Sequence, residues 1–345
     1  MPKVTVLMSA YNTAKYIKSA IDSILSQSFR DFELLIIYNP SQDNTLEIIK
    51  SYNDNRIVLI ENESLLELVD SLNKGLLLAK GEYIARMDAD DISRANRLIY
   101  EVEKLDNNLD IGMVCSDIDV IDNADNIINS PIEVPESEEI YYTLNFRNCI
   151  SHGTVMLRKA LIAGFDGYDK KCYAIEDYDL WYRISKVFII KRIEKPLYCW
   201  RKHDESISHV HATRQRDAVY GVFKNNAINL LGVTIDDMQA RLIWDNACNT
   251  QLVSRDSYSR MELIAIAELI NKLNVAITKV TPKHLNKNYV AQAGNEKYIR
   301  YLIVMSKRIG VLKTLQLISD INEDNTIKKE IVVKLAKNVI KSKIK

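Results

Sequence analysis

Residues 79–91 read AKGEYIARMDADD, and this stretch decides the fold. Its middle is apolar enough for a buried strand, and its last four residues carry the three carboxylates of Asp88, Asp90 and Asp91. Carboxylates crowded at a strand end repel one another unless a cation lies between them. Hard oxygen ligands of this kind suit Mg²⁺ or Mn²⁺, which also bind substrate phosphates. The alternative is an acidic helix start, in which Asp91 caps a helix that begins near Ser93.

The residues before this stretch alternate between strand and helix patterns. Apolar runs rich in β-branched residues predict strands, and apolar residues at helical spacing predict helices between them. The expected strands are Val4–Met8, Phe32–Tyr38, Arg56–Glu61 and Glu82–Met87, and the expected helices are Tyr16–Leu25, Asn44–Tyr52 and Leu65–Lys80. This order predicts an α/β fold with a mostly parallel sheet flanked by helices and joined by right-handed crossovers.

In open sheets of this kind, ligands bind beyond the carboxyl ends of the strands. Three polar segments follow the predicted strands, and they are Ser9–Asn12, Asn39–Asp43 and Asp88–Asp91. We therefore expect these segments to meet at one edge of the sheet and to hold the chemistry.

The rest of the chain is a mixed region followed by a helical one. In the mixed region a helix is expected at Arg94–Leu105, strands at Ile111–Ser116, Thr154–Arg158 and Phe188–Arg192, and a polar strand-and-turn segment at Ile118–Ile132. Long helical patterns follow at Met261–Leu273 and Lys297–Ile318. We expect a boundary near residue 211 and a helical region over residues 211–345.

Composition excludes several classes of protein. Lys plus Arg and Asp plus Glu balance at 46 each, so the total charge does not favour nucleic acid as a partner. The five cysteines form no CxxC motif and suggest reduced thiols in a cytoplasmic protein, and the early first strand predicts no signal peptide. The sequence contains no GxGxxG and no GxxxxGK[ST] motif, which disfavours dehydrogenases and P-loop NTPases, and it contains no GxSxG element.

A second acidic motif, Glu176–Asp179, precedes Leu180 and Trp181. A carboxylate beside another carboxylate has a raised pKa, which suits a general base. The alternative is a solvated helix start with Leu180 and Trp181 packed inward. The residues alone leave His152 and His203 open between structural hydrogen bonding and ligand binding.

Several of these motifs, in the same order, resemble the family 2 glycosyltransferases of GT-A fold, particularly bacterial ones that build surface polysaccharides. The matching stretches lie within residues 4–208 and are Val4–Asn12, Ala20–Phe32, Leu72–Gly75, Ala79–Asp91, Ile150–Arg158, Glu176–Trp181 and Tyr198–Ser208. The resemblance implies a GT-A catalytic domain over residues 1–210, with a nucleotide-binding half of about 1–92 and an acceptor half of about 93–210.

The resemblance also implies a role for each matching residue. Asp88 and Asp90 correspond to the DxD pair, with Asp90 as metal ligand, Asp88 reaching the donor ribose or the metal, and His203 as a third metal-side contact. Asp177 corresponds to the catalytic base, and Glu176 to a group that supports it or orients the acceptor. The implied nucleotide-sugar contacts are Ala10, Tyr11, Asn12, Asn39, Arg86, Asp88 and Ala89, and the implied acceptor-side residues are His152 and Trp181.

One departure from the family pattern follows the second strand. The family has two aspartates and a glycine there, whereas this chain has Asn39, Pro40 and Ser41. Asn39 offers an uncharged oxygen where an aspartate accepts a hydrogen bond from uracil, and Pro40 forbids a positive φ. The base pocket is therefore expected to be reshaped, with UDP as the first candidate nucleotide.

The resemblance implies an inverting, metal-dependent transfer from a nucleotide-diphosphate sugar to a saccharide or lipid-linked acceptor. In this mechanism Asp177 takes the proton of the acceptor hydroxyl, and Mg²⁺ or Mn²⁺ stabilises the departing diphosphate. Two alternatives stay open. One is a catalytically silent nucleotide-sugar-binding or scaffold subunit, and the other is a nucleotidyltransferase, which would release pyrophosphate.

The C-terminal residues 327–345 are basic, with seven Lys and one Glu. An i, i+4 stripe of Ile327, Ile331, Leu335 and Val339 suggests a helix lying on an anionic membrane at the inner face of the plasma membrane. Other apolar residues of the segment fall off this stripe. The alternative is therefore a helix packed on the catalytic domain with a solvated lysine face.

Overall fold

A computed structural model of the protein describes residues 1–172, 174–203, 212–248 and 259–309. Contacts divide the chain into two units. Unit 1 comprises Met1–Leu144 and Asn148–Ala218, and unit 2 comprises Asn145–Arg147 and Val219–Lys345. The boundary expected near residue 211 and the basic segment at residues 327–345 both lie outside the described residues.

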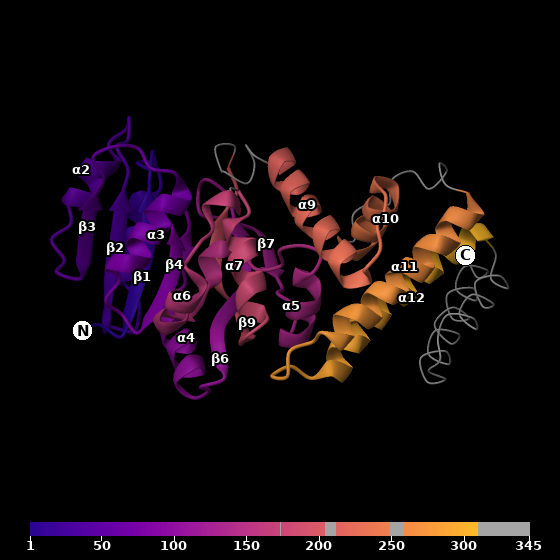
Figure 1. Ribbon diagram of the computed structural model, residues 1–345. Coiled ribbons are helices and arrows are strands. Elements are labelled where there is room, and N and C mark those ends of the chain that lie inside the picture. Colours follow the sequence, from indigo (N-terminus) through magenta and orange to yellow (C-terminus); the bar gives the residue numbers. More distant parts are fainter. Residues whose placement is uncertain (173, 204–211, 249–258, 310–345) are drawn as a thin grey trace. The chain divides into compact units, whose positions relative to one another are not determined.

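Unit 1 is built on one mixed sheet with helices on both faces (Figure 1). Its strands are β1 (Val4–Ala10), β2 (Phe32–Tyr38), β3 (Ile57–Glu61), β4 (Tyr83–Asp88), β5 (Ile92–Ser93), β6 (Ile111–Ile121), β7 (Ile127–Ile132), β8 (Met156–Arg158) and β9 (Ile189–Arg201). Their order is β3-β2-β1-β4-β8-β6-β9-β5, with β7 paired to β6. The first four strands are mutually parallel, as the sequence predicts, and β8 then joins β4 and β6 in antiparallel pairs.

The helices of unit 1 connect these strands or follow them. They are α1 (Ile17–Leu25), α2 (Thr45–Lys50), α3 (Leu68–Leu78), α4 (Arg97–Asp106), α5 (Ser137–Leu144), α6 (Lys159–Phe165) and α7 (Glu176–Ser185), with short 3₁₀ turns η1 (His152–Thr154) and η2 (Lys170–Cys172).

The two faces of the parallel half are buried by different helices. Alternate residues of β1 and β2, among them Val6 and Ile36, form one core cluster with α1, α2 and α4. On the other face α3 lies so close that a Cβ on Gly75 would be 2.2 Å from Cδ1 of Leu7. Burial on both faces explains why these strands read as continuous apolar runs.

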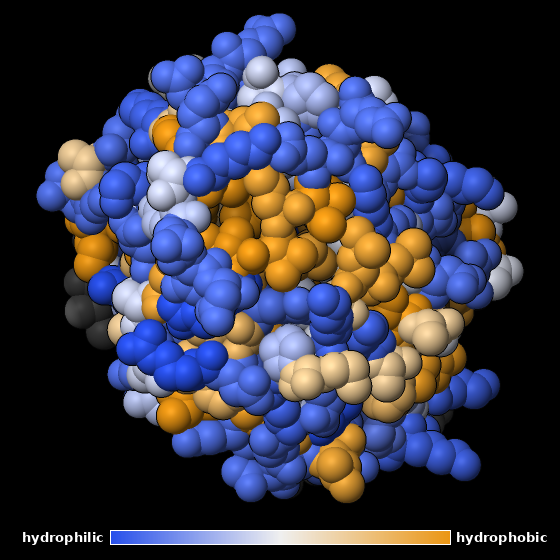
Figure 2. All heavy atoms as spheres, turned by 90° about the vertical axis from the view of Figure 1, so that its left-hand side faces the viewer, coloured by the Kyte–Doolittle hydropathy of each residue, from blue (hydrophilic) through white to orange (hydrophobic). Residues whose placement is uncertain are grey.

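Strand β3 forms one edge of the sheet. Its residues Ile57, Val58, Leu59 and Ile60 are half-buried. Figure 2 looks onto this end of unit 1 and shows apolar side chains gathered near its centre within a hydrophilic surround. The sheet is thus less completely covered at β3 than at β1 or β2.

Strand β6 extends beyond the predicted Ile111–Ser116 because buried carboxylates in its second half have partners. Asp117 accepts hydrogen bonds from Arg192 Nε and Arg192 Nη2 at 2.8 Å each, and Asp119 pairs with Arg94. Strand β9 also runs past the expected Arg192, to Arg201. A buried carboxylate can lie within a strand when it is paired with a cation. Hydrophobic patterning in the sequence does not reveal such strand residues.

Unit 2 is helical, and hydrogen bonds connect some of its helices. In the described residues its helices are α9 (Ala212–Leu231), whose first turns belong to unit 1, α10 (Asp237–Cys248), α11 (Arg260–Lys279) and α12 (Lys287–Ile309). Ser259 and Glu262 form a capping box that starts α11. Asn274 of α11 donates to the Gly294 carbonyl of α12 at 2.9 Å. The start of α12 is ten residues earlier than the predicted Lys297, because its first turns carry few apolar residues.

Two further observations concern the cysteines and membrane-spanning helices. Cys115, Cys172 and Cys199 are free thiols. Across the described residues, no helix combines the length and the apolar character that crossing a membrane requires.

Candidate active site

The site forms where β1, β2 and β4 end. In the parallel register Ser9 lies beside Asp88, and Ala10 lies beside Tyr38. The polar segments that follow these strands therefore meet at one edge of the sheet, as the sequence predicts.

The end of β4 carries a charge pair. The guanidinium of Arg86 forms an ion pair with the Asp88 carboxylate, and the Arg86 side chain is only 4% exposed. Burial and the neighbouring Asp90 raise the pKa of Asp88, and Arg86 opposes the shift. The backbone N–H of Asp88 donates to the hydroxyl of Tyr198 on β9 at 3.0 Å. Side chain and backbone of Asp88 are thus both held.

Asp90 and His203 are in direct contact. Nε2 of His203 lies 2.9 Å from Oδ2 of Asp90, and the His203 ring packs on the Tyr16 ring with centroids 5.1 Å apart. Arg201 Nε donates to the Asp90 carbonyl at 2.7 Å, and this hydrogen bond holds the main chain of Asp90 in place. The resemblance placed His203 beside Asp90, and the structure brings them together.

Asp91 does not cap a helix. Its Oδ1 accepts a hydrogen bond from the backbone N–H of Arg201 at 2.7 Å, and α4 begins only at Arg97. The side chain is buried, and burial together with Asp90 and Asp88 raises the pKa of Asp91 well above its usual value. The capping alternative is therefore wrong, because Asp91 links β4 to β9.

The second acidic motif starts α7. Asp177 Oδ2 accepts a hydrogen bond from Asn148 Nδ2 at 2.8 Å, and Oδ1 accepts one from the backbone N–H of Tyr178 at 2.6 Å. Burial and the neighbouring Glu176 raise the pKa of Asp177 to about 7, although these hydrogen bonds and Arg86 lower it. Burial also raises the pKa of Glu176. A carboxyl group that titrates near neutrality is suited to general-base work.

The two acidic motifs are electrostatically coupled to the same cation. The charge of Arg86 lowers the pKa values of Asp88, Glu176 and Asp177, and Asp88 in turn raises that of Glu176. The Val155 carbonyl accepts the Arg86 N–H at 2.9 Å, and the His152 ring meets Trp181 of α7 with centroids 5.8 Å apart. Strand β4 and helix α7, far apart in the sequence, therefore both contact residues 152–155.

His152 belongs to an aromatic cluster with Tyr168 and Trp181. Nε2 of His152 lies 2.8 Å from the hydroxyl of Tyr168, and its ring meets Trp181 edge-on with centroids 5.8 Å apart. Burial and Arg86 lower the pKa of His152 well below its usual range, so the ring is neutral. Trp181 is 0% exposed and packs inward, so it supports His152 from behind and offers no surface to an acceptor.

The loops that follow β1 and β2 are tied together. Ala10 is buried and Tyr11 is exposed, while Asn12 has a positive φ of 50° and its Oδ1 accepts from the Gln42 N–H at 2.8 Å. The Asn12 N–H in turn donates to Ser41 Oγ at 3.0 Å. These contacts fix the segment that the resemblance assigns to nucleotide binding.

The side chain of Asn39 is fully engaged within the protein. Its Oδ1 accepts from Asn62 Nδ2 at 2.9 Å and from the Leu66 N–H at 3.1 Å, and its Nδ2 donates to Ser71 Oγ at 3.0 Å and to the Leu66 carbonyl. The residue is 3% exposed. A hydrogen bond from Asn39 to a base would require one of these bonds to break.

Comparisons with known proteins identify the family. The Glycosyl transferase family 2 profile matches residues 5–165. The O-antigen biosynthesis glycosyltransferase WbnJ of Escherichia coli is 36% identical over 188 residues, which are 52% of this chain and 71% of WbnJ. An uncharacterized glycosyltransferase of Methanocaldococcus jannaschii, MJ1057, is 36% identical over 187 residues, 53% of this chain and 64% of that protein. The chain belongs to glycosyltransferase family 2.

The fold of this family 2 member is GT-A. The crystal structure of S. aureus TarS 1–349 in complex with UDP-GlcNAc superposes with a TM-score of 0.55 at 19% identity, covering 89% of this chain and 92% of that one. The predicted fold class is confirmed.

Several residues that shape the site were not singled out by the sequence. Tyr198 holds the Asp88 N–H, and a Cβ on Gly153 would lie 2.2 Å from its hydroxyl. Asn73 of α3 binds both the N–H and the carbonyl of Tyr168, at 2.9 and 2.8 Å. Asn148 orients Asp177. Asn73 and Gly153 lie within the matching stretches Leu72–Gly75 and Ile150–Arg158, but the sequence did not reveal their contacts.

The residues near Asp90 fit a divalent ion in part. Within the described parts of the chain, no group of three or more His, Cys, Asp or Glu side chains is arranged around a common metal position. Asp90 and His203 supply one carboxylate and one imidazole close together, whereas Asp88 is engaged with Arg86. One or two protein ligands with substrate phosphates completing the shell is the usual arrangement for Mg²⁺.

Proposed function

We propose that this chain is an inverting glycosyltransferase that moves a sugar from a nucleotide-diphosphate sugar to a saccharide or lipid-linked acceptor in bacterial surface polysaccharide synthesis. The observation that carries the proposal is that β4, which ends in Asp88, and α7, which starts with Glu176 and Asp177, both contact residues 152–155. The similarity to WbnJ, a glycosyltransferase of O-antigen biosynthesis, supports the polysaccharide setting.

In this mechanism Asp177 is the general base. Its pKa of about 7 leaves a substantial ionised fraction at neutral pH, and Asn148 and the Tyr178 N–H hold its two oxygens in place. The carboxylate takes the proton of the acceptor hydroxyl as that oxygen attacks the anomeric carbon. The new glycosidic bond forms as the bond to the diphosphate breaks, so one displacement inverts the anomeric centre.

Other residues bind and orient the reactants. Arg86 forms an ion pair with Asp88, and burial together with Glu176 keeps the pKa of Asp177 high. Asp90 and His203 would hold Mg²⁺ or Mn²⁺, which when bound neutralises charge on the departing diphosphate. Ala10, Tyr11 and Asn12 would line the nucleotide site, with Ala89 beside the diphosphate. His152, kept neutral by burial, would face the acceptor side.

UDP-linked sugars are the first donors to test, since the TarS structure contains UDP-GlcNAc. Because Asn39 is hydrogen-bonded within the protein, we propose that the base is held by backbone groups and by other residues of the β1 and β2 loops. The altered sequence Asn39-Pro40-Ser41 is the observation that keeps a silent nucleotide-sugar-binding subunit as the second candidate.

A two-stage experiment tests the proposal. First, thermal unfolding is measured with a panel of nucleotide sugars and Mn²⁺, because a ligand that binds the folded state raises the melting temperature. Donor turnover is then measured for the wild type and for Asp177→Asn. Binding in both proteins with turnover only in the wild type supports the enzyme. Binding without turnover in either indicates the silent subunit, and pyrophosphate release indicates a nucleotidyltransferase.

The basic segment at residues 327–345 carries a separate proposal of peripheral membrane contact. Its net positive charge would attract anionic headgroups. Flotation with vesicles containing anionic lipid tests this on the full chain and on residues 1–326. Equal flotation of the two proteins would dismiss the contact.

A further inference from the structure

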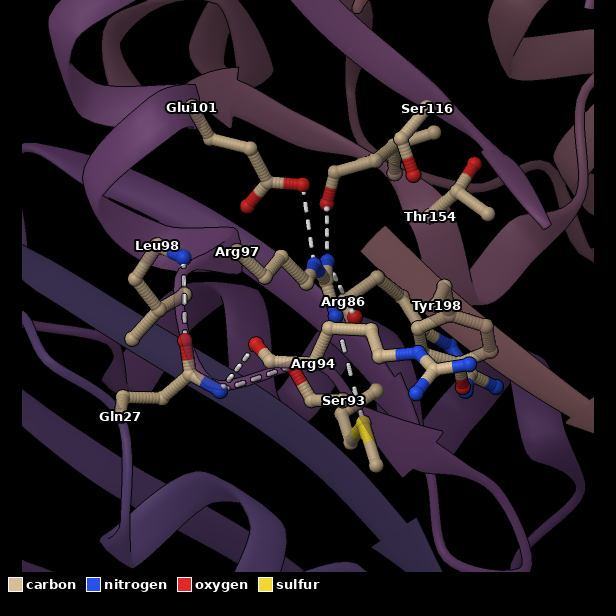
Figure 3. A network of polar contacts seen from close by, with 12 residues as sticks. Gln27, Arg86, Ser93, Arg94, Arg97, Leu98, Glu101, Ser116, Thr154 and Tyr198 are labelled. Atoms are coloured by element: carbon tan, nitrogen blue, oxygen red, sulfur yellow. Dashed lines mark hydrogen bonds and ion pairs between the residues drawn. The ribbon is translucent and has the colours of Figure 1, made fainter. Parts of the chain in front are cut away.

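A buried guanidinium lies directly behind the end of β4. Arg97, the first residue of α4, is 0% exposed, and its Nε donates to Glu101 Oε1 at 2.9 Å. Its Nη2 donates to two backbone carbonyls, those of Arg86 at 3.0 Å and Val155 at 3.2 Å. Figure 3 shows the Arg97 side chain pointing from α4 toward these groups, with Glu101 beside it. One side chain thus joins α4, β4 and the segment before β8.

The two carbonyls belong to backbone that carries site residues. The Val155 carbonyl also accepts the Arg86 N–H at 2.9 Å, so Arg97 completes a junction between β4 and the segment that follows His152. Arg86 is the residue whose guanidinium forms an ion pair with Asp88. Arg97 therefore anchors the main-chain carbonyl of Arg86 to α4.

Arg97 also packs against Tyr198. The guanidinium carbon lies 5.2 Å from the centroid of the Tyr198 ring, within the range of a cation–π contact. The Tyr198 hydroxyl accepts the Asp88 N–H at 3.0 Å, and the absence of a side chain at Gly153 leaves room for that hydroxyl. Through the ring, Arg97 fixes the backbone position of Asp88.

Stability alone does not account for this pair. Replacing a buried ion pair by apolar residues of similar size is often neutral or stabilising, because the desolvation of two charges is costly. Glu101 is 0% exposed, and its Oε2 has no hydrogen-bond partner. Burying this pair therefore costs more free energy than burying apolar side chains of the same size would. What the pair provides instead is a set of directional hydrogen bonds from Arg97 to the backbone carbonyls of Arg86 and Val155.

We propose that Arg97 is a positioning residue for the transfer reaction, holding Arg86 and, through Tyr198, the Asp88 N–H in the geometry that places the donor against Asp177. This inference rests on the proposed function for its catalytic consequence. Its structural part, the fixing of the end of β4, is independent of any donor. Arg97 itself touches no reacting atom in this scheme.

The test removes both charges of the pair at once. In Arg97→Met/Glu101→Leu no buried charge is left without a partner, so the protein is expected to fold with a melting temperature close to that of the wild type. Hydrogen–deuterium exchange without ligand is expected to rise roughly tenfold in peptides covering residues 83–91 and 150–156, and not in β2 or β3. Donor turnover is expected to show a ~10–100-fold lower kcat with a smaller change in KM, since misplacement by about 1 Å has such effects.

Two further variants keep the inference testable if the double variant does not fold. Tyr198→Phe removes only the hydroxyl that accepts the Asp88 N–H and should lower kcat in the same direction. Arg97→Lys keeps the positive charge beside Glu101 but loses the planar guanidinium that donates to several groups at once. Its kcat should therefore be lower than that of the wild type. Binding of UDP with Mn²⁺ is measured in parallel for every variant.

The outcomes separate the two proposals. Wild-type kcat and unchanged exchange at residues 83–91 in folded Arg97→Met/Glu101→Leu, or wild-type kcat in Tyr198→Phe, would overturn the positioning role. If the wild type itself neither binds nor turns over nucleotide sugars, the proposed function fails. In that case, increased exchange at residues 83–91 in the double variant would still support Arg97 as the residue that fixes this strand end.

Discussion

Asp177→Asn is expected to abolish transfer and at the same time to stabilise the protein at neutral pH. The folded state raises the pKa of Asp177 from 3.8 to about 7, chiefly by burial and by the charge of Glu176. An asparagine has no charge to bury. The substitution therefore removes a destabilising ionisation that the wild type carries for its proposed chemistry.

The sign and size of this effect follow from proton linkage. Below about pH 4 both folded and unfolded Asp177 are protonated, so titration makes no difference there. Between pH 4 and about 7 the unfolded state releases its proton first, so the wild type loses stability as pH rises; above 7 the loss is constant. A shift of about 3 units corresponds to ~4 kcal/mol at most.

Two effects reduce this figure. The Asp177 side chain is partly exposed, so water screens its charge. The new amide nitrogen would also face the Asn148 amide donor, which costs ~1 kcal/mol. A net gain of about 2 kcal/mol at pH 8 is expected, equivalent to a rise of roughly 4–8 °C in melting temperature.

The assay compares melting temperatures of wild type and Asp177→Asn from pH 4 to pH 8, together with transfer rates. The matched control is Asp179→Asn, two residues along the same helix. Asp179 is paired with Arg183 at 2.7 Å, so its replacement should lose a little stability and keep transfer. A difference in melting temperature that does not grow with pH, or transfer within tenfold of wild type, would refute the reasoning about Asp177.

Three further predictions concern the same region. The rate of transfer should fall as pH drops through about 7, because protonated Asp177 cannot accept a proton. Glu176→Gln removes a charge that raises the pKa of Asp177, so it should move the midpoint of the pH–rate profile to lower pH. A rate that is constant from pH 6 to 8 would contradict the assignment of Asp177 as the base. Asp90→Asn should raise the Mn²⁺ concentration for half-maximal activity by roughly tenfold or more, and wild-type activity that persists in EDTA would count against the ion. Gly81→Ala should destabilise by ~3 kcal/mol in chemical denaturation, since its Cβ would lie 2.3 Å from the Thr5 backbone nitrogen, whereas Gly164→Ala, with no atom within 4 Å, should not.

The parallel half of the sheet could be predicted because strands that are buried on both faces are continuous apolar runs in the sequence. Strand β2 was predicted to its terminal residues, Phe32–Tyr38, since every residue in it is buried. Strand β8 has only three residues, and its position between β4 and β6 depends on non-local pairing that no local pattern encodes. Strand β6 was predicted too short because Asp117 and Asp119 look like loop residues until their partners Arg192 and Arg94 are known.

The candidate site was predictable in its residues but not in its contacts. The acidic motifs at Asp88 and Asp177 were visible in the sequence, yet only the resemblance suggested that they meet. Arg86 was assigned to the donor, and its ion pair with Asp88 appears only in the folded chain. The hydrogen bonds that engage Asn39 could not be foreseen, because Asn62, Leu66 and Ser71 come from other segments.

The charge balance of the site supports the proposed ion independently of the resemblance. The site has four carboxyl groups, those of Asp88, Asp90, Glu176 and Asp177. The guanidinium of Arg86 is already paired with Asp88, and that of Arg201 is already paired with Asp125. A diphosphate entering this region would add negative charge to an existing excess of carboxylates, and the repulsion would be strong in a partly buried site. A divalent cation between Asp90 and the diphosphate reverses the sign of that interaction. Donor affinity and metal concentration should therefore be coupled, so a donor that binds equally well with and without Mn²⁺ would exclude this arrangement of charges.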